Sequence, residues 1–227
     1  MPDGNFTVTF RECLFEDKIL ATQRYPEKNP GYSVRQLLMC MCITEVNGNP
    51  VGKALKDPTA LLKRFTISDS QCIQRFFNSL SFLSTERSAE AKAVAKRIKD
   101  KAPLADVYDI AKESFPTKSH SIKFRRVMDD ERMACERIYP ANDPNCGYAF
   151  EDLLTARAIV EIDGVEQKQN TKEDVDIFAK WKSLDQEFAM AIYISLFAAS
   201  LKQLDNVEEL GKTLLADVYG NSGDAAA

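Results

Sequence analysis

A chain of 227 residues in which 44% of the side chains are apolar and 28% are charged has the composition of an ordinary globular protein. No apolar run approaches the roughly 18 residues of a transmembrane helix, which excludes a helical membrane span. The first residues, MPDGNFTV, lack the basic start and apolar stretch of a signal peptide, so we expect synthesis in the cytoplasm.

The first predicted element is a short alternating strand over residues 7–10, followed by an amphipathic helix over residues 16–25. The acidic first turn of this helix suits the helix dipole. Tyr25-Pro26 ends it, because the residue before a proline is pushed out of the helical region. The same succession returns as a strand over residues 121–124 and a helix over residues 129–139, ended by Tyr139-Pro140.

A second helix begins near Ser33 and is apolar on almost every side, which predicts a central position in a core. Residues 43–51 then predict a β-hairpin, because Asn47-Gly48 is the strongest two-residue turn signal. A similar helix begins near Ala149, and Asp163-Gly164 repeats the turn.

A third helix is predicted after Asp57-Pro58, and a fourth begins at Ser68 with a capping box. The counterpart of the fourth helix begins at Ser183, also with a capping box. Both fourth helices are predicted to bury their large apolar residues: Ile73, Phe76, Phe77, Leu80 and Leu83 in one, and Phe188, Ile192, Leu196 and Leu201 in the other. The last helices are predicted over residues 86–100 and 207–219.

These parallels predict that the chain is a tandem duplication. Phe10-Arg11 matches Phe124-Arg125 at an offset of 114, and beyond the inserted Asn145-Cys146 the offset is 116 without a further gap. At the second offset Gly31 falls on Gly147.

The predicted fold class is therefore α+β, mostly helical, in which one module of short strand, helices, β-hairpin and helices occurs twice. We expect a first module over residues 1–102, a helical linker over 103–120, a second module over 121–220 and a flexible tail over 221–227.

The six cysteines contain no C-x-x-C pair, and His120 is the single histidine, so a zinc site lacks its usual spacing. Cys40 and Cys42 align with Ala156 and Ala158, which predicts free thiols buried as small apolar side chains. Cys146, in the inserted loop, is the cysteine expected to be exposed. We expect no metal and no cofactor.

The charge distribution is uneven. Residues 92–126, here called the basic joint, hold 10 basic and 4 acidic side chains, whereas residues 127–227 hold 9 and 20. Two readings stay open: solvated lysine-rich helices, or electrostatic docking of one module on the other or on an acidic partner. Nucleic acid is not expected, because interleaved aromatic residues and a binding motif are missing. The candidate partner-contact residues are Lys92, Lys96, Lys99, Arg125 and Arg126.

The sequence does not predict an enzyme. Phosphate-binding loops, dinucleotide fingerprints, nucleophile elbows and metal spacings are all missing, and His120 is expected in a surface loop. The residues common to both copies are those of cores and turns, and the shared charges Arg11/Arg125 and Glu45/Glu161 make no catalytic set. We therefore expect no catalytic residue and no small-molecule substrate.

The order of an F-R strand end, an acidic helix ending in Tyr, a Leu-Leu helix and an I-x-E-[VI]-[ND]-G hairpin resembles small proteins of contractile phage tails. The nearest are the baseplate hub and wedge-associated proteins of T-even-type phages and the tail-assembly chaperones. The pattern covers residues 10–83 and again 124–201, although this chain is duplicated and lacks the cysteine-rich insert of some hub proteins.

The resemblance implies a non-enzymatic virion protein of the tail baseplate, working within a symmetric assembly of other tail proteins. Its two modules would occupy quasi-equivalent positions and bridge neighbouring subunits. The alternatives are a tail-assembly chaperone that binds the tape-measure protein, and a bacterial adaptor unrelated to phages.

Overall fold

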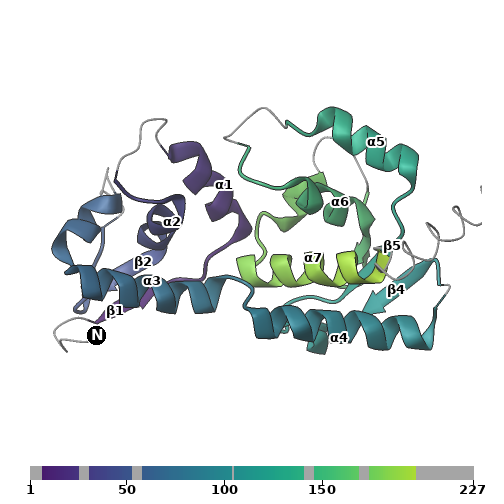
Figure 1. Cartoon of the computed structure of the whole chain (residues 1–227), viewed down its shortest axis with the longest axis horizontal. Coiled ribbons are helices and arrows are strands. Elements are labelled where there is room, and N and C mark those ends of the chain that lie inside the picture. Colours follow the sequence, from purple (N-terminus) through teal and green to yellow (C-terminus); the bar gives the residue numbers. More distant parts are fainter. Residues whose placement is uncertain are drawn as a thin grey trace, which may run out of the picture. The chain divides into compact units, whose positions relative to one another are not determined.

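The computed structural model describes residues 7–25, 31–52, 58–103, 105–140, 146–168 and 174–197 (Figure 1). The chain divides into two compact units, Met1–Ser195 and Leu196–Ala227. Only the end of one helix represents the second unit among the described residues, so the predicted helix over residues 207–219 and tail over 221–227 lie outside them. The fold class is α+β with helices dominating, as predicted.

The described residues of the first half of the large unit form three strands and five helical segments. In chain order they are β1 (Val8–Phe10), α1 (Phe15–Arg24), α2 (Val34–Cys42), β2 (Ile43–Val46), β3 (Asn49–Pro50), the 3-10 helix η1 (Pro58–Arg64), α3 (Ile67–Ser81) and α4 (Thr85–Lys101).

The second half repeats much of this order after an additional strand. Its elements are β4 (Val107–Ile110), η2 (Lys112–Ser114), β5 (Ile122–Arg125), α5 (Asp129–Ile138), α6 (Phe150–Ala158), β6 (Ile159–Ile162), β7 (Val165–Glu166), η3 (Asp174–Phe178) and α7 (Ser183–Phe197).

Two antiparallel sheets have strand orders β1-β2-β3 and β4-β5-β6-β7. In the first, Val8 pairs with Val46 and Phe10 with Ile43, and the register shifts after Thr9. The second has the same irregularity after Lys123, where β5 pairs with β6. Both pairings therefore carry a bulge at the same place in the strand.

Both predicted hairpins are confirmed. Asn47 and Gly48 have φ values of 54° and 73°, and Asp163 and Gly164 have values of 51° and 81°. Positive φ at both central residues makes the type I′ turn whose twist matches that of the paired strands.

The predicted starts of α2, α6 and α7 are confirmed, whereas that of α3 and the capping role of Ser183 need correction. Ser33 caps α2 by accepting a hydrogen bond from the Gln36 amide. The cap of α3 is Thr66, which accepts from the Asp69 amide, and not Ser68. Ser183 does open α7, but its buried hydroxyl has no hydrogen-bond partner, so it does not act as a cap.

The prediction of a helical linker over residues 103–120 is wrong. Residues 107–110 form β4, which pairs antiparallel with β5 along its whole length. Val, Tyr and Ile favour strands, and their alternation buries Tyr108 and Ile110 while Val107 and Asp109 stay exposed. This segment is a fourth strand of the second sheet, and the predicted boundaries at 102 and 120 lie inside the unit Met1–Ser195.

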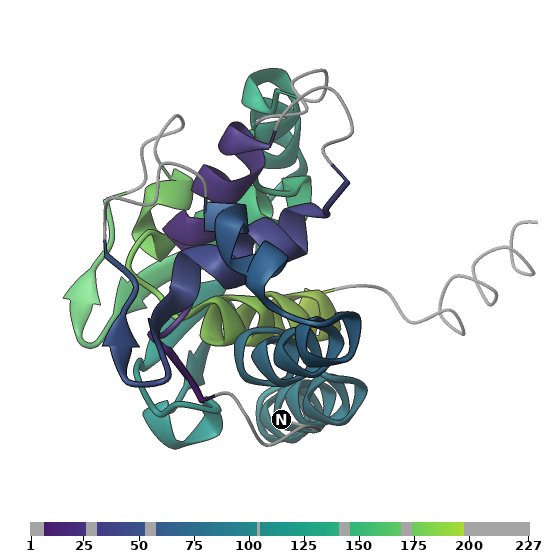
Figure 2. The ribbon, with the colours of Figure 1, turned by 90° about the vertical axis from the view of Figure 1, so that its left-hand side faces the viewer.

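The core of the first half surrounds α2, as predicted. Leu37, Leu38, Met39, Cys40 and Cys42 are all buried. The predicted burial of the fourth helix is wrong for Phe76 and Leu80 of α3, which are 58% and 50% exposed. It is right for α7, where Phe188 and Ile192 are buried. Figures 1 and 2 show α4 running alongside α7, so α7 has a cover that α3 does not share.

Among the described residues, no helix combines the length and the apolarity needed to cross a membrane.

Candidate functional site

The predicted contact residues divide into two groups. Lys92, Lys96 and Lys99 lie on α4, where the first two are exposed and Lys99 is half-buried. Arg125 ends β5, and Arg126 follows it and is exposed. Lys92 and Lys96 are therefore the lysines of α4 best placed to meet a partner.

The guanidinium of Arg125 is already engaged in hydrogen bonds within the fold. Its two terminal nitrogens donate to the two carboxylate oxygens of Glu131 at 2.6 and 2.5 Å, and the Met128 amide donates to the same carboxylate. The hydrogen bonds from Arg125 lower the pKa of Glu131 to about 2, and the pKa of Arg125 is raised. Arg125 therefore fixes the start of α5 and is not a free contact residue.

Arg11 has the same arrangement in the first half. It donates to both carboxylate oxygens of Asp17 at 2.6 and 2.7 Å, and the Leu14 amide donates to Asp17 as well. The hydrogen bond to Asp17 raises the pKa of Arg11. The shared pair Arg11/Arg125 is thus architectural: each arginine clamps the carboxylate in the first turn of the helix that follows its strand.

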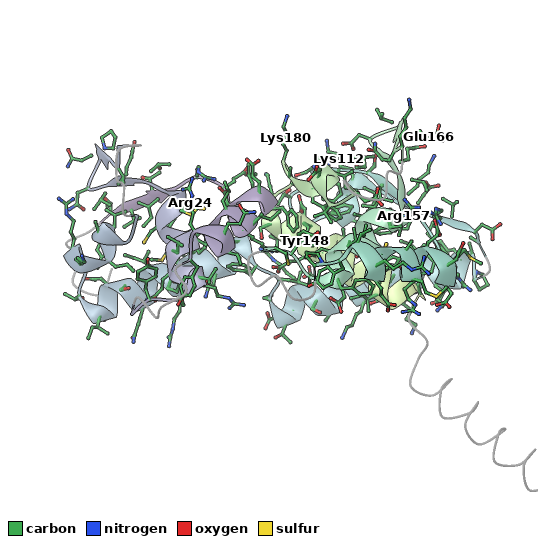
Figure 3. All side chains as sticks on the ribbon, turned by 90° about the horizontal axis from the view of Figure 1, so that it is seen from above. Arg24, Lys112, Tyr148, Arg157, Glu166 and Lys180 are labelled. Carbon is green, nitrogen blue, oxygen red and sulfur yellow. The ribbon has the colours of Figure 1, made fainter. Side chains whose placement is uncertain are left out.

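In the second half this clamp extends into a network. Arg157 of α6, labelled in Figure 3, lies 3.4 Å from the Glu131 carboxylate and 3.2 Å from that of Asp174. These three side chains are at most 19% exposed. Arg157 therefore ties α5, α6 and η3 together.

The two halves meet through their backbones. We call residues 12–19 and 179–187 together the junction. The Phe15 amide donates to the Trp181 carbonyl at 2.9 Å, and the Ser183 amide donates to the Cys13 carbonyl at 2.8 Å. Leu14 and Lys182 form an antiparallel bridge between them.

Polar side chains reinforce the junction. The Lys18 ammonium lies 2.5 Å from one oxygen of Glu187, whose other oxygen accepts from the Leu83 amide at 2.7 Å. Next to this pair, Gln186 donates to Asp152, whose pKa is raised by burial. Glu187 thus connects α1, the start of α4 and α7.

Gly147 brings a loop of the second half against α1. Its φ is +78°, and a Cβ added there would lie 2.6 Å from the Cα of Ile19. The sequence carried one signal for this contact, since the insertion Asn145-Cys146 directly precedes Gly147 and has no counterpart in the first half. Periodicity and motif spacing gave no signal for Lys18 or Glu187.

His120 lies in a loop, as predicted, but its side chain is half-buried. Its side chain is 23% exposed and stacks on Trp181 with ring centroids 4.4 Å apart. Its Nδ1 lies 2.9 Å from the Asp163 carboxylate. Burial acts to raise the pKa of Asp163, but the hydrogen bonds from His120 and Ser121 outweigh it and lower that pKa. His120 therefore belongs to the aromatic packing around Trp181.

Cys13, Asp17 and Cys42 are buried with their ligand atoms within 4.8 Å of one another, a grouping that could suggest a metal site. A metal needs thiolates and a free carboxylate. Here Asp17 is held by Arg11, and the hydrogen bond of the Cys42 thiol with Cys13, together with burial, raises the pKa of Cys42. The set therefore fits a packed polar cluster better than a metal centre.

The exposed thiol is Cys72 and not Cys146, which corrects the prediction. Cys146 is half-buried and donates to the Tyr148 carbonyl at 3.2 Å, while Cys72 lies on the exposed side of α3. The inserted residue is held because its loop packs into the junction.

Comparisons with known protein families, with curated proteins and with solved structures gave no match to this chain.

Proposed function

We propose that this chain is a non-enzymatic assembly protein formed by tandem duplication, which bridges neighbouring subunits of a contractile phage tail baseplate through its two modules. The observation that best supports the duplication is the shift in strand pairing register that occurs after Thr9 in β1 and after Lys123 in β5. A bulge at one position is a feature that two unrelated strands have no reason to share.

Two further details support the duplication. The arginine clamps Arg11–Asp17 and Arg125–Glu131 begin equivalent helices with equivalent bonds. A tyrosine hydroxyl also closes equivalent loops: Tyr25 donates to the Tyr32 carbonyl at 2.7 Å, and Tyr139 donates to the Tyr148 carbonyl at 3.3 Å.

An assembly role follows from what the two halves share and what they do not. The shared polar groups clamp helices and close loops, so they serve architecture. The surfaces differ in charge, with exposed Lys92 and Lys96 on α4 and a strongly acidic sequence over residues 127–227. Two similar modules with different surfaces suit a protein that contacts two different neighbours.

The baseplate assignment rests on the resemblance to tail proteins in the order of strand, helices and hairpin. It implies other tail proteins as partners and the virion as location. An exposed Met- and Cys-rich α2 would favour the chaperone alternative, because soft side chains suit grooves that bind varied partners. The burial of this helix removes that support. The bacterial adaptor remains the alternative if the resemblance is only one of spacing.

Mass spectrometry of purified tail particles tests this proposal. A baseplate protein is present in stoichiometric amounts, whereas a chaperone is found only with the unassembled tape-measure protein. Absence from both would support the adaptor and refute the tail assignment.

Charge reversal tests the role of the basic joint. Lys92→Glu with Lys96→Glu should slow incorporation into particles, and the defect should be largest at low salt because exposed charges are screened as salt rises. The matched control is Lys63→Glu with Lys168→Glu, two exposed lysines outside both the basic joint and the junction. Equal incorporation of both double variants would remove the basic joint from the mechanism.

A further inference from the structure

The strand β1 has an open edge beside exposed apolar side chains. In the described part of the chain, β1 pairs with β2 on one edge and with no strand on the other. Phe76 of α3 packs beside this strand, with its ring centroid 6.4 Å from that of Phe10. Leu80 follows one turn later on the same side of α3. We call Phe76 and Leu80 the α3 stripe.

The second half has this same surface covered. The strand β4 pairs with β5, and there Ile122 and Phe124 are 2% and 0% exposed. Their counterparts Val8 and Phe10 are only half-buried. Ile192, the counterpart of Phe76, is fully buried, whereas Phe76 is 58% exposed. Among the described residues, the first half therefore lacks the strand that covers the matching edge in the second half.

The other sheet edges are protected against strand addition, but β1 is not. The edge strand β3 contains Pro50, β4 contains Asp109, and β7 contains Glu166. Proline and charged side chains are the usual devices that prevent edge pairing. The three residues of β1, Val-Thr-Phe, include neither.

We propose that the β1 edge is the contact surface for a second copy of this chain, which adds its own β1 antiparallel across a two-fold axis. The contact deepens the proposed function, on which it rests, by naming one of the neighbours that the protein bridges. An antiparallel self-pair is the isologous arrangement of most dimers, and neutral residues meet without like-charge repulsion. The result is a continuous six-stranded sheet with the α3 stripes of both copies beside the new seam.

The register follows from the length of β1. Pairing all three residues places Thr9 opposite Thr9 of the second copy and Val8 opposite Phe10 of the second copy. This keeps Val8 and Phe10 of both copies on one face, next to the α3 stripe, because side chains alternate along a strand.

Dimerisation of the purified full-length chain tests the contact. The wild type should show a concentration-dependent dimer in analytical ultracentrifugation. Phe76→Glu should weaken it at least about tenfold, because it places a charge at the centre of an apolar interface. The control is Ile67→Glu on the same helix, which removes an 80% exposed apolar side chain from the opposite face and should leave the dimer unchanged.

A cross-link tests the register. In a Cys72→Ser background, Thr9→Cys should form an intermolecular disulfide under mild oxidation, because directly opposed Cα atoms in an antiparallel pair lie about 4.5–5.5 Å apart. Thr7→Cys, which is opposite residue 11 of the second copy, should not. Both threonines are exposed, so neither change disturbs a core.

Three results would overturn the proposal. One is a wild type that stays monomeric throughout the concentration series, and another is a dimer that tolerates Phe76→Glu and does not cross-link through Thr9→Cys. The third is a monomer whose incorporation into particles is lost with Phe76→Glu, which assigns the edge to a different protein. A dimer that is missing from particles would instead refute the proposed function and leave the contact standing.

Discussion

Replacing Gly147 by alanine should separate the two halves at the junction. At a φ of +78°, the left-handed conformation of an alanine lowers the free energy of unfolding by roughly 1–2 kcal/mol. Its Cβ would also lie 2.6 Å from the Cα of Ile19, so either α1 or the loop has to move. Displacing packed backbone costs about another 1–3 kcal/mol. We expect a total destabilisation of about 2–5 kcal/mol.

Gly31→Ala is the matched control. Gly31 occupies the equivalent position in the first half with a φ of +80°, and a Cβ added there meets no atom within 4 Å. This variant should show the conformational cost alone, roughly 1–2 kcal/mol. The difference between the two variants therefore isolates the contact between the loop and α1.

Urea unfolding followed by Trp181 fluorescence and by far-UV circular dichroism measures both variants. Trp181 is the single tryptophan, it is buried, and its carbonyl accepts the Phe15 amide at the junction. Gly147→Ala should also change the fluorescence before any denaturant is added. Equal midpoints for Gly147→Ala and Gly31→Ala would refute the close packing of α1 on the loop.

Three further predictions concern acid stability, the core and the thiols. Glu131→Gln should lower the free energy of unfolding by about 1–3 kcal/mol at neutral pH, and by less as acid is added. A carboxylate with a lowered pKa stabilises the fold above pH 4.5 and loses this effect as the pH falls towards about 2. A constant difference between wild type and variant from pH 7 to pH 2 would contradict this prediction. Leu38→Ala should cost about 2–5 kcal/mol in urea unfolding, since Leu38 is 3% exposed in the first core, and a cost below about 0.5 kcal/mol would mean that α2 is not central. In thiol labelling followed by mass spectrometry, Cys72 should react before Cys146 and long before Cys40, and the reverse order would contradict the exposed side of α3.

Elements fixed by local chemistry could be predicted from the sequence. Asn47-Gly48 and Asp163-Gly164 set the two hairpins, because few other residue pairs accept positive φ twice in succession. Tyr-Pro ended α1 and α5 within a residue of the prediction. In each case the controlling residues lie within the element itself.

Features that depend on a distant neighbour could not be predicted. Phe76 and Ile192 occupy matching positions in α3 and α7, yet only Ile192 is buried, because α4 runs alongside α7 and α3 does not share this cover. The sequence predicts a helical linker where β4 lies, because a four-residue strand carries too little alternation to distinguish a strand from a helix. The stacking of His120 on Trp181 likewise depends on residues 61 positions apart in sequence.

For the candidate site, the charge asymmetry could be predicted from the sequence, but the partner of each charged side chain could not. Arg125 and Arg126 are adjacent and chemically identical, and only the structure distinguishes them, because Arg125 is directed to Glu131. The carboxylate at the third position of the following helix was available as a signal. Arg11 binds Asp17 and Arg125 binds Glu131 with the same spacing along the chain.

The junction also has a consequence for synthesis. Lys18 bonds to groups 168 and 169 residues later in the chain. At the usual translation rate of about 5–20 residues per second, α1 leaves the ribosome roughly 10–30 s before its partner segment. During that interval Phe15 and Lys18 lack their partners in residues 179–187. Contacts between residues so far apart in sequence also form slowly, because a large loop must close. Two chains that are translated side by side on one messenger RNA could therefore exchange halves. Fewer ribosomes per messenger RNA should favour pairing of the two halves within one chain.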